Sequence, residues 1–583
     1  MTGNRTPSAG KAGGSVTRRG VLRGAVGAGA VTLAGAGAAR GGTAAPELPN
    51  GLAPYRTAYL NWSGEIAHPG LWACAPRTPQ DLVDLANWAH AEGWRLRPRG
   101  MAHTWSPLTI TPAMPSGDRV LLLDTTEHLT HVELADPPAG APGAVRAQPG
   151  VLLEDLMAFL ADNGLGVTNT PAPGELTLGG TLAIDAHGTS VPAEGETPRP
   201  GHTYGTLSNL VLSLTAVVWD ETRGAYALKT FERGRDPECG ALAAHLGRGL
   251  VAEAVLQAGR ETPLRCVSRI DIPADELFAP PGSRAAAGGR TFGDFVNASG
   301  RVEAIWFAFT DKPWLKVWSP SPSRPTGARG VHSPYNYPFS DSVPESVSRL
   351  AGRLVAEAAW YLAPVLGAAQ WTAAAGGLSL TAAHDLWGPS YCLLFYLRPT
   401  TLRETANGYA ILTRRADVQR VIAEFAGFYQ ERLNAWAAAG RYPVNGQVEI
   451  RVAGLDQPTD NAAPGAGPPL LSVVRPHPER PDWDCAIWVD VLTQPETPGA
   501  AEFYRELERF LMRTFDGGHA LARVEWSKGW AYTDAASWAD GEVIGEWVPA
   551  SYAPGQFGEA VGILDRLDPH RVFGNPFLDQ LLG

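Results

Sequence analysis

The chain has 583 residues, of which 44% are hydrophobic and 18% are charged, so we expect at least two folded domains and exclude wholesale disorder. The 48 Lys and Arg residues against 59 Asp and Glu residues give a formal net charge of -11, which argues against nucleic acid as a partner. The chain also has 19 tryptophans, and we expect most of these large side chains in the core.

Residues 1–45 have the pattern of an export signal. The pair Arg18-Arg19 precedes a Gly- and Ala-rich apolar run that ends at Arg40, and small residues continue to Ala45. The run is shorter than the roughly 20 residues that a membrane-spanning helix needs. The pattern predicts a twin-arginine signal peptide and a secreted protein. This route is associated with proteins that are exported already folded, often around a cofactor, which favours a prosthetic group.

Helical and strand patterns alternate after the signal, up to about residue 270. The predicted elements are a helix over 79–93, strands over 94–97 and 120–123, a helix over 151–162 and a buried strand over 210–219. This alternation predicts a first domain over residues 46–270.

From residue 271 the composition becomes rich in Pro, Gly, Ser and Trp. We expect helices over 343–366, 408–438 and 556–566, and strands near 301–309, 447–453 and 485–492. The pattern predicts a second, α+β domain over 271–540 and a C-terminal segment over 541–583. The five cysteines lie far apart without metal-ligand spacing, so no metal site is expected.

Three glycine-containing segments of the first domain are the ones most suited to holding a ligand. They are 97–106 (RPRGMAHTWS), 171–189 (PAPGELTLGGTLAIDAHGT) and 204–209 (YGTLSN). In the first, a strand runs into a turn whose backbone N–H groups and arginines suit a pyrophosphate. No GxGxxG fingerprint and no P-loop motif is present, which disfavours a Rossmann or P-loop nucleotide site.

The order of these segments resembles the FAD-binding domain of the vanillyl-alcohol-oxidase and p-cresol-methylhydroxylase type. Further segments are similar to the covalent-flavin, type II bacterial cholesterol oxidases: 309–318 (FTDKPWLKVW), 333–341 (SPYNYPFSD), 448–451 (VEIR), 525–531 (EWSKGWA) and 568–573 (DPHRVF). The resemblance covers essentially the whole chain after the signal. It implies a two-domain α+β fold in which 46–270 bind FAD, 271–540 bind substrate and 541–583 return to the FAD-binding domain.

The resemblance also implies how the cofactor is held. His103 occupies the position at which members of that superfamily often tether the flavin 8α carbon, so covalent FAD is expected; the alternative is that His103 only hydrogen-bonds a dissociable flavin. The other residues expected to bind the cofactor are Arg99, Gly100, Met101, Ala102, Thr104, Gly179, Gly180, His187, Gly188, Tyr204, Ser208, Asn209 and Asn575.

For catalysis, the resemblance places Glu303, Glu449 and Arg451 over the flavin ring. Glu449 and Arg451 are two apart on a predicted strand, so their side chains face the same side; a structural ion pair is the alternative to a catalytic role. A buried glutamate against an apolar sterol is expected to have a raised pKa, which suits proton transfer. Asp490 stands where the type II pattern has an asparagine, and it is expected to be protonated, to bind Arg451 or to repel Glu449.

The function implied is oxidation of the 3β-hydroxyl of cholesterol or a related sterol to a ketone, with dioxygen reduced to hydrogen peroxide and with a shift of the ring double bond from the 5-ene to the 4-ene. Two alternatives stay open: an FAD-linked oxidase or dehydrogenase of sugars or aldonolactones, and a sterol-binding protein with a vestigial flavin fold. A sterol substrate also suggests peripheral contact with membranes. The sequence does not indicate an oligomeric state.

Overall fold

The computed structural model describes residues 45–583, apart from 113, 115–117, 340–349 and 351. The export signal predicted for residues 1–45 therefore lies outside the described residues, except for Ala45. Among the described helices, none is long and apolar enough to cross a bilayer.

Strands at the N-terminal end of the described chain form a four-stranded sheet with the order β1-β2-β4-β3. Helix α2 (Pro79–Glu92) covers it and confirms the helix predicted over 79–93: the Thr78 hydroxyl caps its first turn, and Gly93, with a φ of 66°, ends it. The strands are β1 (Tyr55–Leu60), β2 (Ala67–Cys74), β3 (Arg95–Arg99) and β4 (Val120–Asp124).

A second, six-stranded sheet has the order β5-β6-β10-β8-β9, and β7 pairs with β10 at its side. The buried strand predicted over 210–219 is β8, which lies between β10 and β9 in this sheet. The strands are β5 (Val132–Ala135), β6 (Gly143–Ala147), β7 (Leu165–Gly166), β8 (Val211–Asp220), β9 (Ala225–Glu232) and β10 (Leu250–Arg260).

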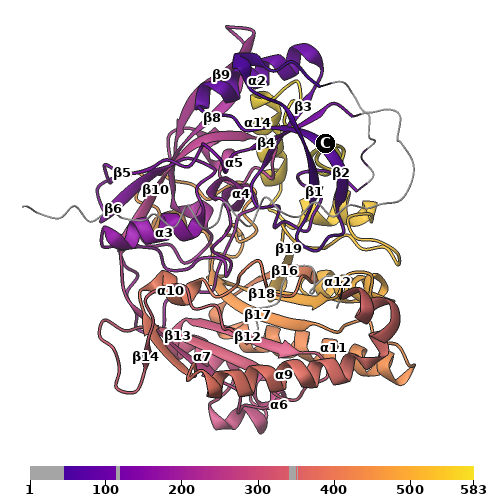
Figure 1. The fold of residues 1–583 in the computed structure, drawn as a ribbon. Helices are drawn as coiled ribbons and strands as arrows, with labels where there is room; N and C mark the ends of the chain where they lie inside the picture. The colour runs from indigo at the N-terminus through magenta and orange to yellow at the C-terminus, as the bar shows by residue number, and fades with distance from the viewer. Residues whose placement is uncertain (1–44, 113, 115–117, 340–349, 351) are drawn as a thin grey trace, which may run out of the picture. The chain divides into compact units, whose positions relative to one another are not determined.

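The third sheet has nine strands in the order β14-β15-β11-β13-β12-β17-β18-β16-β19. Figure 1 shows it below the other two sheets, with α7, α9 and α11 along one side. The strands are β11 (Leu264–Arg269), β12 (Arg301–Phe307), β13 (Trp314–Pro320), β14 (Arg329–Gly330), β15 (Asp385–Gly388), β16 (Thr405–Thr413), β17 (Gln447–Gly454), β18 (Cys485–Thr493) and β19 (Ala520–Val524).

The helices complete the list of elements. They are α3 (Leu153–Asp162), α4 (Leu178–Ala183), α5 (Pro237–Leu242), α6 (Ala274–Leu277), α7 (Phe292–Ser299), α9 (Ala363–Leu380), α10 (Ser390–Leu394), α11 (Val418–Ala438), α12 (Ala500–Thr514), α13 (Val548–Ala550), α14 (Gln556–Leu567) and α15 (Pro576–Leu582).

Two predicted helices differ from the structure. The pattern over 408–438 is divided: residues 405–413 are strand β16, and α11 begins only at Val418. Every residue of β16 is buried, so both faces of the strand are mainly apolar. In such a short run the hydrophobic residues show no periodicity that distinguishes a strand from a helix. Of the pattern over 343–366, residues 343–349 and 351 lie outside the described residues, whereas α9 continues to Leu380.

The change from the second to the third sheet falls between β10, which ends at Arg260, and β11, which begins at Leu264. This is earlier than the boundary predicted at 270, because β11 pairs with β13 and β15. The two halves nevertheless share one hydrophobic core, which contains Leu214 of β8 together with Ile450 of β17.

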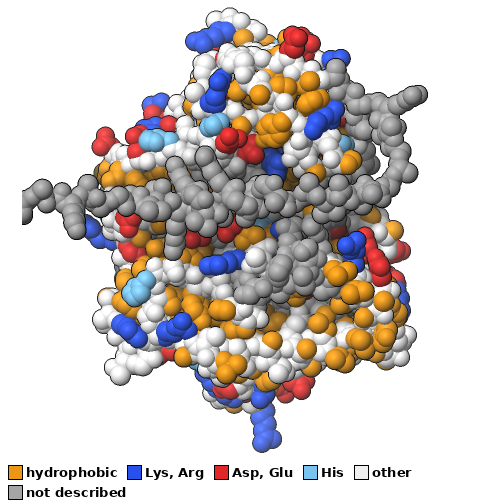
Figure 2. Space-filling model, viewed as in Figure 1, with side chains coloured by type: hydrophobic (Ala, Val, Ile, Leu, Met, Phe, Trp, Pro, Cys, Tyr) orange, Lys and Arg blue, Asp and Glu red, His pale blue; other side chains and the backbone are white. Residues whose placement is uncertain are grey.

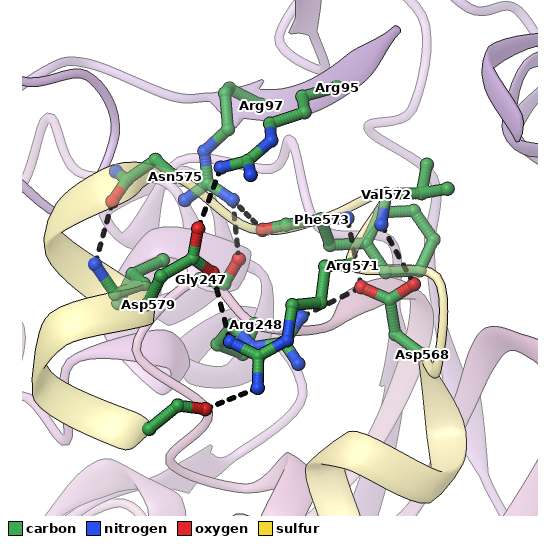
Figure 3. A network of polar contacts seen from close by, with 12 residues as sticks. Arg95, Arg97, Gly247, Arg248, Asp568, Arg571, Val572, Phe573, Asn575 and Asp579 are labelled. Carbon is green, nitrogen blue, oxygen red and sulfur yellow. Dashed lines mark hydrogen bonds and ion pairs between the residues drawn. The ribbon is translucent and has the colours of Figure 1, made fainter. Parts of the chain in front are cut away.

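The C-terminal segment is joined to the N-terminal sheet and its loops by buried polar contacts, which we call the tail clasp and define as Arg97, Arg248, Asp568 and Asn575 (Figure 3). Arg248 Nη1 lies 2.8 Å from Asp568 Oδ2, and both side chains are buried. Asn575 donates to the carbonyls of Pro107 and Leu108, in the loop that follows His103. The tail therefore fixes the position of this loop.

Candidate active site

An elongated cavity separates the glycine-containing segments of the first half from β17 and β18 of the nine-stranded sheet. It brings together most of the residues that the sequence singled out. Those that line it are Arg99, Gly100, Met101, Ala102, His103, Thr104, Gly179, Gly180, His187, Gly188, Glu449, Arg451 and Asp490.

Four residues that we expected to bind the cofactor lie outside the lining. The Ser208 hydroxyl donates to the Leu182 carbonyl, and the Asn209 amide donates to the carbonyl of Gln457. Both side chains thus join segments of backbone behind the cavity. Membership of a motif does not determine the direction of a side chain. The side chains of Ser208 and Asn209 point away from the cavity.

The same correction applies to Tyr204 and Asn575. The Tyr204 carbonyl accepts from the Gly454 amide, and its ring lies 5.8 Å from the Arg301 guanidinium carbon. Asn575 caps α15 by accepting from the Leu578 amide while its Nδ2 binds the loop carbonyls. Asn575 therefore supports the loop after His103 from behind.

His103 lies in a loop whose conformation is fixed by its neighbours. The preceding Ala102 has a φ of 53°, a left-handed conformation that is uncommon for a residue with a side chain. The imidazole stacks on Trp62, with ring centroids 3.9 Å apart, and meets Trp105 edge-on at 5.6 Å. Burial, together with the nearby charges of Lys528 and Arg403, lowers the pKa of His103 to about 3, so the ring is neutral and a nitrogen lone pair is available.

Two further features of the lining suit a bound cofactor. Asp185 and Leu246 also have positive φ values, of 60° and 54°, so the cavity wall holds several strained backbone positions. The Thr170 hydroxyl and the Arg99 Nε atom are buried without a hydrogen-bond partner among the described residues. Such atoms require a partner, and a ligand rich in phosphate and hydroxyl oxygens supplies one.

Gly100 shows why the turn before His103 needs glycine. A Cβ atom at this position would lie 2.1 Å from Thr177 Oγ1. The Thr177 hydroxyl caps α4, the short helix that carries Gly179 and Gly180. Close contact between the loop and this helix end brings two segments of the cavity wall together.

Glu303 lies in β12, directly behind the lining. Its carboxylate is fully buried and lies 2.7 Å from Arg451 Nη2 and 3.6 Å from Lys316 Nζ, and the Tyr396 hydroxyl donates to it at 2.7 Å. Tyr396 lines the cavity, whereas Glu303 does not. Glu303 therefore reaches the cavity only through its partners.

Lys316 is enclosed by aromatic rings. Its Nζ atom lies within 5.3 Å of four ring centroids, those of Trp314, Trp318, Tyr337 and Tyr396. Burial outweighs the attraction of Glu303 and lowers the pKa of Lys316 to about 8. The ammonium group is therefore mostly protonated at neutral pH and loses its proton as the pH rises through about 8.

Arg451 is the centre of the charged cluster, because the strand register places carboxylates around it. In β17 it is two residues from Glu449, its position pairs with Glu303 of β12, and Glu449 pairs with Asp490 of β18. Arg451 contacts the carboxylates of all three. Although burial opposes a charge, these carboxylates raise the pKa of Arg451 well above its usual range, and Arg451 and Lys528 lower the pKa of Glu449.

Asp490 is the carboxylate that stands at the unexpected position. Its Oδ2 lies 3.1 Å from Arg451 and 3.3 Å from Lys528 Nζ. Burial and the charge of Glu525 nevertheless raise the pKa of Asp490 to about 8. A neutral Asp490 leaves Glu303, Glu449 and Glu525 to balance three cations: Arg451, Lys528 and Lys316.

Sequence reasoning missed several functional residues. Glu525 and Lys528 lie in a segment that carried the resemblance, but neither was assigned a role. Both line the cavity, and the charge of Lys528 and a hydrogen bond with His187 overcome burial and lower the pKa of Glu525 to about 2. His187 stacks on Trp488 with ring centroids 3.5 Å apart.

Glu404 was also missed. It precedes β16, lines the cavity and accepts a hydrogen bond from the Gln494 amide at 3.2 Å. Burial and the charge of Glu449 raise the pKa of Glu404 to about 8. The sequence does carry a sign of buried charged residues such as Lys316, which was also missed. Lys316 is the only charged residue in the apolar strand Trp314–Pro320.

Comparisons with known proteins assign both halves of the chain. A family model described as cholesterol oxidase, substrate-binding, matches residues 263–583, and one described as FAD binding domain matches residues 72–222. A solved structure of a solvent-stable cholesterol oxidase is 48% identical, with a TM-score of 0.88, and covers 93% of this chain and 100% of its own.

Two solved structures of cholesterol oxidase from Brevibacterium sterolicum match with the same coverage. One is 44% identical; the other, a variant in which a histidine is replaced by alanine, is 43% identical; both have a TM-score of 0.87. No curated protein sequence matches the chain.

Proposed function

The chain belongs to the cholesterol oxidase family and is an FAD-dependent alcohol oxidase, and we propose that its Glu303–Arg451–Glu449 cluster handles the protons of sterol oxidation. The observation that supports this most is the position of the cluster. Arg451 and Glu449 face the same cavity as His103, whose position the family resemblance assigns to the flavin. FAD held in this cavity would supply the hydride acceptor for the alcohol carbon, and dioxygen would take up the two electrons and two protons as hydrogen peroxide.

Among the three residues, we assign the contact with the substrate hydroxyl to Glu449. It lines the cavity, and its lowered pKa keeps it ionised at neutral pH, so it can accept the hydroxyl proton. Arg451 stabilises negative charge that develops beside it, and Glu303 fixes Arg451 from behind. The same geometry supports the 5-ene to 4-ene isomerisation, because a carboxylate in the wall can take a proton from one ring carbon and return it to another.

The covalent link between His103 and the flavin 8α carbon is the second part of the proposal. Its support is the neutral imidazole on the cavity wall, held by Trp62 in a strained loop. Wild-type protein precipitated with acid and washed should keep its yellow colour in the pellet, whereas His103→Ala should release the flavin into the supernatant. Flavin retained by His103→Ala would refute the link, and flavin released by both proteins would show that it is dissociable.

Export and membrane contact complete the proposal. The Arg18-Arg19 pair before an apolar run supports secretion by the twin-arginine route, and a sterol substrate supports peripheral contact with a lipid surface. Replacing both arginines by lysine should leave the enzyme inside an expressing bacterium. Equal secretion of the two proteins would contradict this route.

Peroxide formation distinguishes the sterol oxidase from its rivals. Purified protein given cholesterol in detergent should produce peroxide, and a sugar or aldonolactone at the same concentration should not. The cavity-lining Trp318, Leu394 and Leu397 favour a flat apolar substrate. Peroxide with the sugar and none with sterols would overturn the proposal, and a colourless, inactive protein would indicate a binding protein.

A further inference from the structure

Helix α9 presents an apolar surface to solvent. The side chains of Leu354, Tyr361, Leu362, Val365 and Leu380 are between 43% and 91% exposed. No Lys, Arg, Asp or Glu stands between Glu357 and Asp385. Figure 2 shows hydrophobic side chains gathered over this helix on the lower front face of the molecule. Exposed apolar residues grouped in this way mark an interaction site rather than an ordinary surface.

The outward face of α9 carries no charged side chain along its whole length. Buried Ala363, Gly367, Ala374 and Leu378 form its inner side, so an amphipathic helix would carry charges on the outer side. Small and apolar residues stand there instead, at the three- and four-residue spacing of one helical face: Leu362, Val365, Ala369, Ala373, Gly376 and Leu380.

The exposed hydroxyl groups of α9 are satisfied within the helix. Thr372 donates to the Ala368 carbonyl at 2.7 Å, and Ser379 donates to the Ala375 carbonyl at 3.2 Å. A hydroxyl that binds one turn back needs no water to satisfy its donor. The face can therefore leave water without stranding these polar groups, which suits a lipid environment.

The surface packs against residues that lie directly behind the active-site wall. A Cβ atom at Gly367 would lie 2.0 Å from the Ala308 carbonyl, so α9 rests directly on the end of the strand that carries Glu303. A Cβ atom at Gly352 would lie 2.5 Å from Gln494, whose amide binds the cavity-lining Glu404. A layer of lipid against α9 would thus lie next to the sheet whose residues line the active-site cavity.

We propose that residues 361–380, the α9 face, dock on an uncharged phospholipid bilayer with α9 lying in the plane of the headgroup boundary. This rests on the proposed membrane contact and gives it a location. The absence of charge on the face and the net charge of -11 favour a neutral lipid surface over an anionic one. Because no described helix can span a bilayer, the contact is peripheral.

Vesicles of phosphatidylcholine without sterol test this location, because they separate docking from substrate recognition. The full enzyme should float with these vesicles, and Leu362→Glu/Val365→Glu should reduce the bound fraction about ten-fold, since two charges would have to enter the headgroup boundary. Leu134→Glu is the matched control: Leu134 is 51% exposed on β5, away from α9, and its replacement should change binding less than two-fold.

Turnover of cholesterol in detergent micelles shows whether the variants are folded and active, and it should stay within two-fold of wild type for both. Wild-type protein that fails to bind the vesicles would refute the membrane contact itself. Wild-type binding that the α9 variant retains would refute only the location. A wild-type dimer that the α9 variant converts to a monomer would assign the face to a second copy and overturn the proposal.

Discussion

Two buried arginines, one in each half of the molecule, are held in opposite ways. Arg97 of β3 donates to backbone carbonyls, among them those of Thr109 at 3.0 Å and Gly247 at 2.8 Å, and burial lowers its pKa to about 9. Arg451 of β17 faces carboxylates, and the pKa of Arg451 rises. The carbonyl groups around Arg97 hold its side chain in place without adding ionised groups. The carboxylates around Arg451 are ionisable, so they can accept and release protons. The first arrangement fits a structural role, and the second fits the catalytic role that we propose for Arg451.

The largest effect expected in the tail clasp is on stability. Asp568 accepts from Tyr226 Oη at 2.5 Å and from the amides of Val572 and Phe573, besides pairing with buried Arg248. Asp568→Asn removes the charge that Arg248 requires, so the free energy of unfolding should fall by about 3–5 kcal/mol. Thermal or urea unfolding measures it, and turnover per folded molecule should be unchanged.

A neighbouring residue provides the control for this variant. Asp565 also pairs with Arg248, at 2.9 Å, but its side chain is 40% exposed. Asp565→Asn should therefore cost no more than about 1 kcal/mol. If Asp568→Asn unfolds like wild type, the clasp does not have the structural role assigned to it.

In the charged cluster around Arg451, substitution should lower turnover and leave stability nearly unchanged. Arg451→Lys keeps the charge but loses the planar fork that contacts three carboxylates at once. Turnover should fall about 10²- to 10³-fold, as for other lost electrostatic donors, with little change in melting temperature. Unchanged kinetics would remove Arg451 from the mechanism, and a collapse of stability would place it with Arg97.

Lys316 tests whether Glu303 acts through its surroundings. Because the pKa of Lys316 is lowered to about 8, its ammonium group loses charge as the pH rises through this value, and Glu303 then loses a partner. Lys316→Met should reduce turnover about ten-fold at pH 7 and should flatten the change in rate near pH 8, since removing a cation beside a buried carboxylate raises that carboxylate's energy. A pH–rate profile identical in shape to wild type would show that Lys316 only fills space.

The pH dependence of stability tests whether Asp490 is protonated in the folded protein. Its pKa is raised from the ordinary 3.8 to about 8, so the folded state holds a proton that the unfolded chain releases. The stabilisation from this proton is complete below about pH 4 and is lost as the pH rises toward 8. Asp490→Asn should show a smaller fall in melting temperature between pH 5 and pH 8 than wild type. An equal or steeper fall would contradict the assignment of a neutral Asp490.

The sequence predicted local structure well and tertiary contacts poorly. The helix over 79–93 follows from the Thr78 cap, the apolar period and Gly93, all of which are local. That Glu449 and Arg451 share a side follows from strand geometry alone. The partners of Arg451 do not, because Glu303 and Asp490 arrive from two other strands whose register is set by the whole sheet.

The same limit explains why some expected residues lie outside the cavity lining. Ser208 and Asn209 stand in a motif with a binding role, but the turn Leu207–Leu210 directs both side chains to backbone groups behind it. Lys316 and Glu404 belong to no motif with a binding role, and their surroundings come from distant strands and helices, so they were missed. A lone charge in an apolar run is a usable sign of such a residue, whereas its partners need the fold.

The flavin absorbance after anaerobic addition of cholesterol reports directly on whether the cavity oxidises a sterol. With dioxygen excluded, cholesterol should bleach the oxidised flavin of the wild-type enzyme, and admitting dioxygen should restore the colour and yield hydrogen peroxide. Arg451→Lys should bleach about 10²- to 10³-fold more slowly. A flavin that cholesterol fails to bleach would contradict the account of the cavity as a sterol-oxidising site.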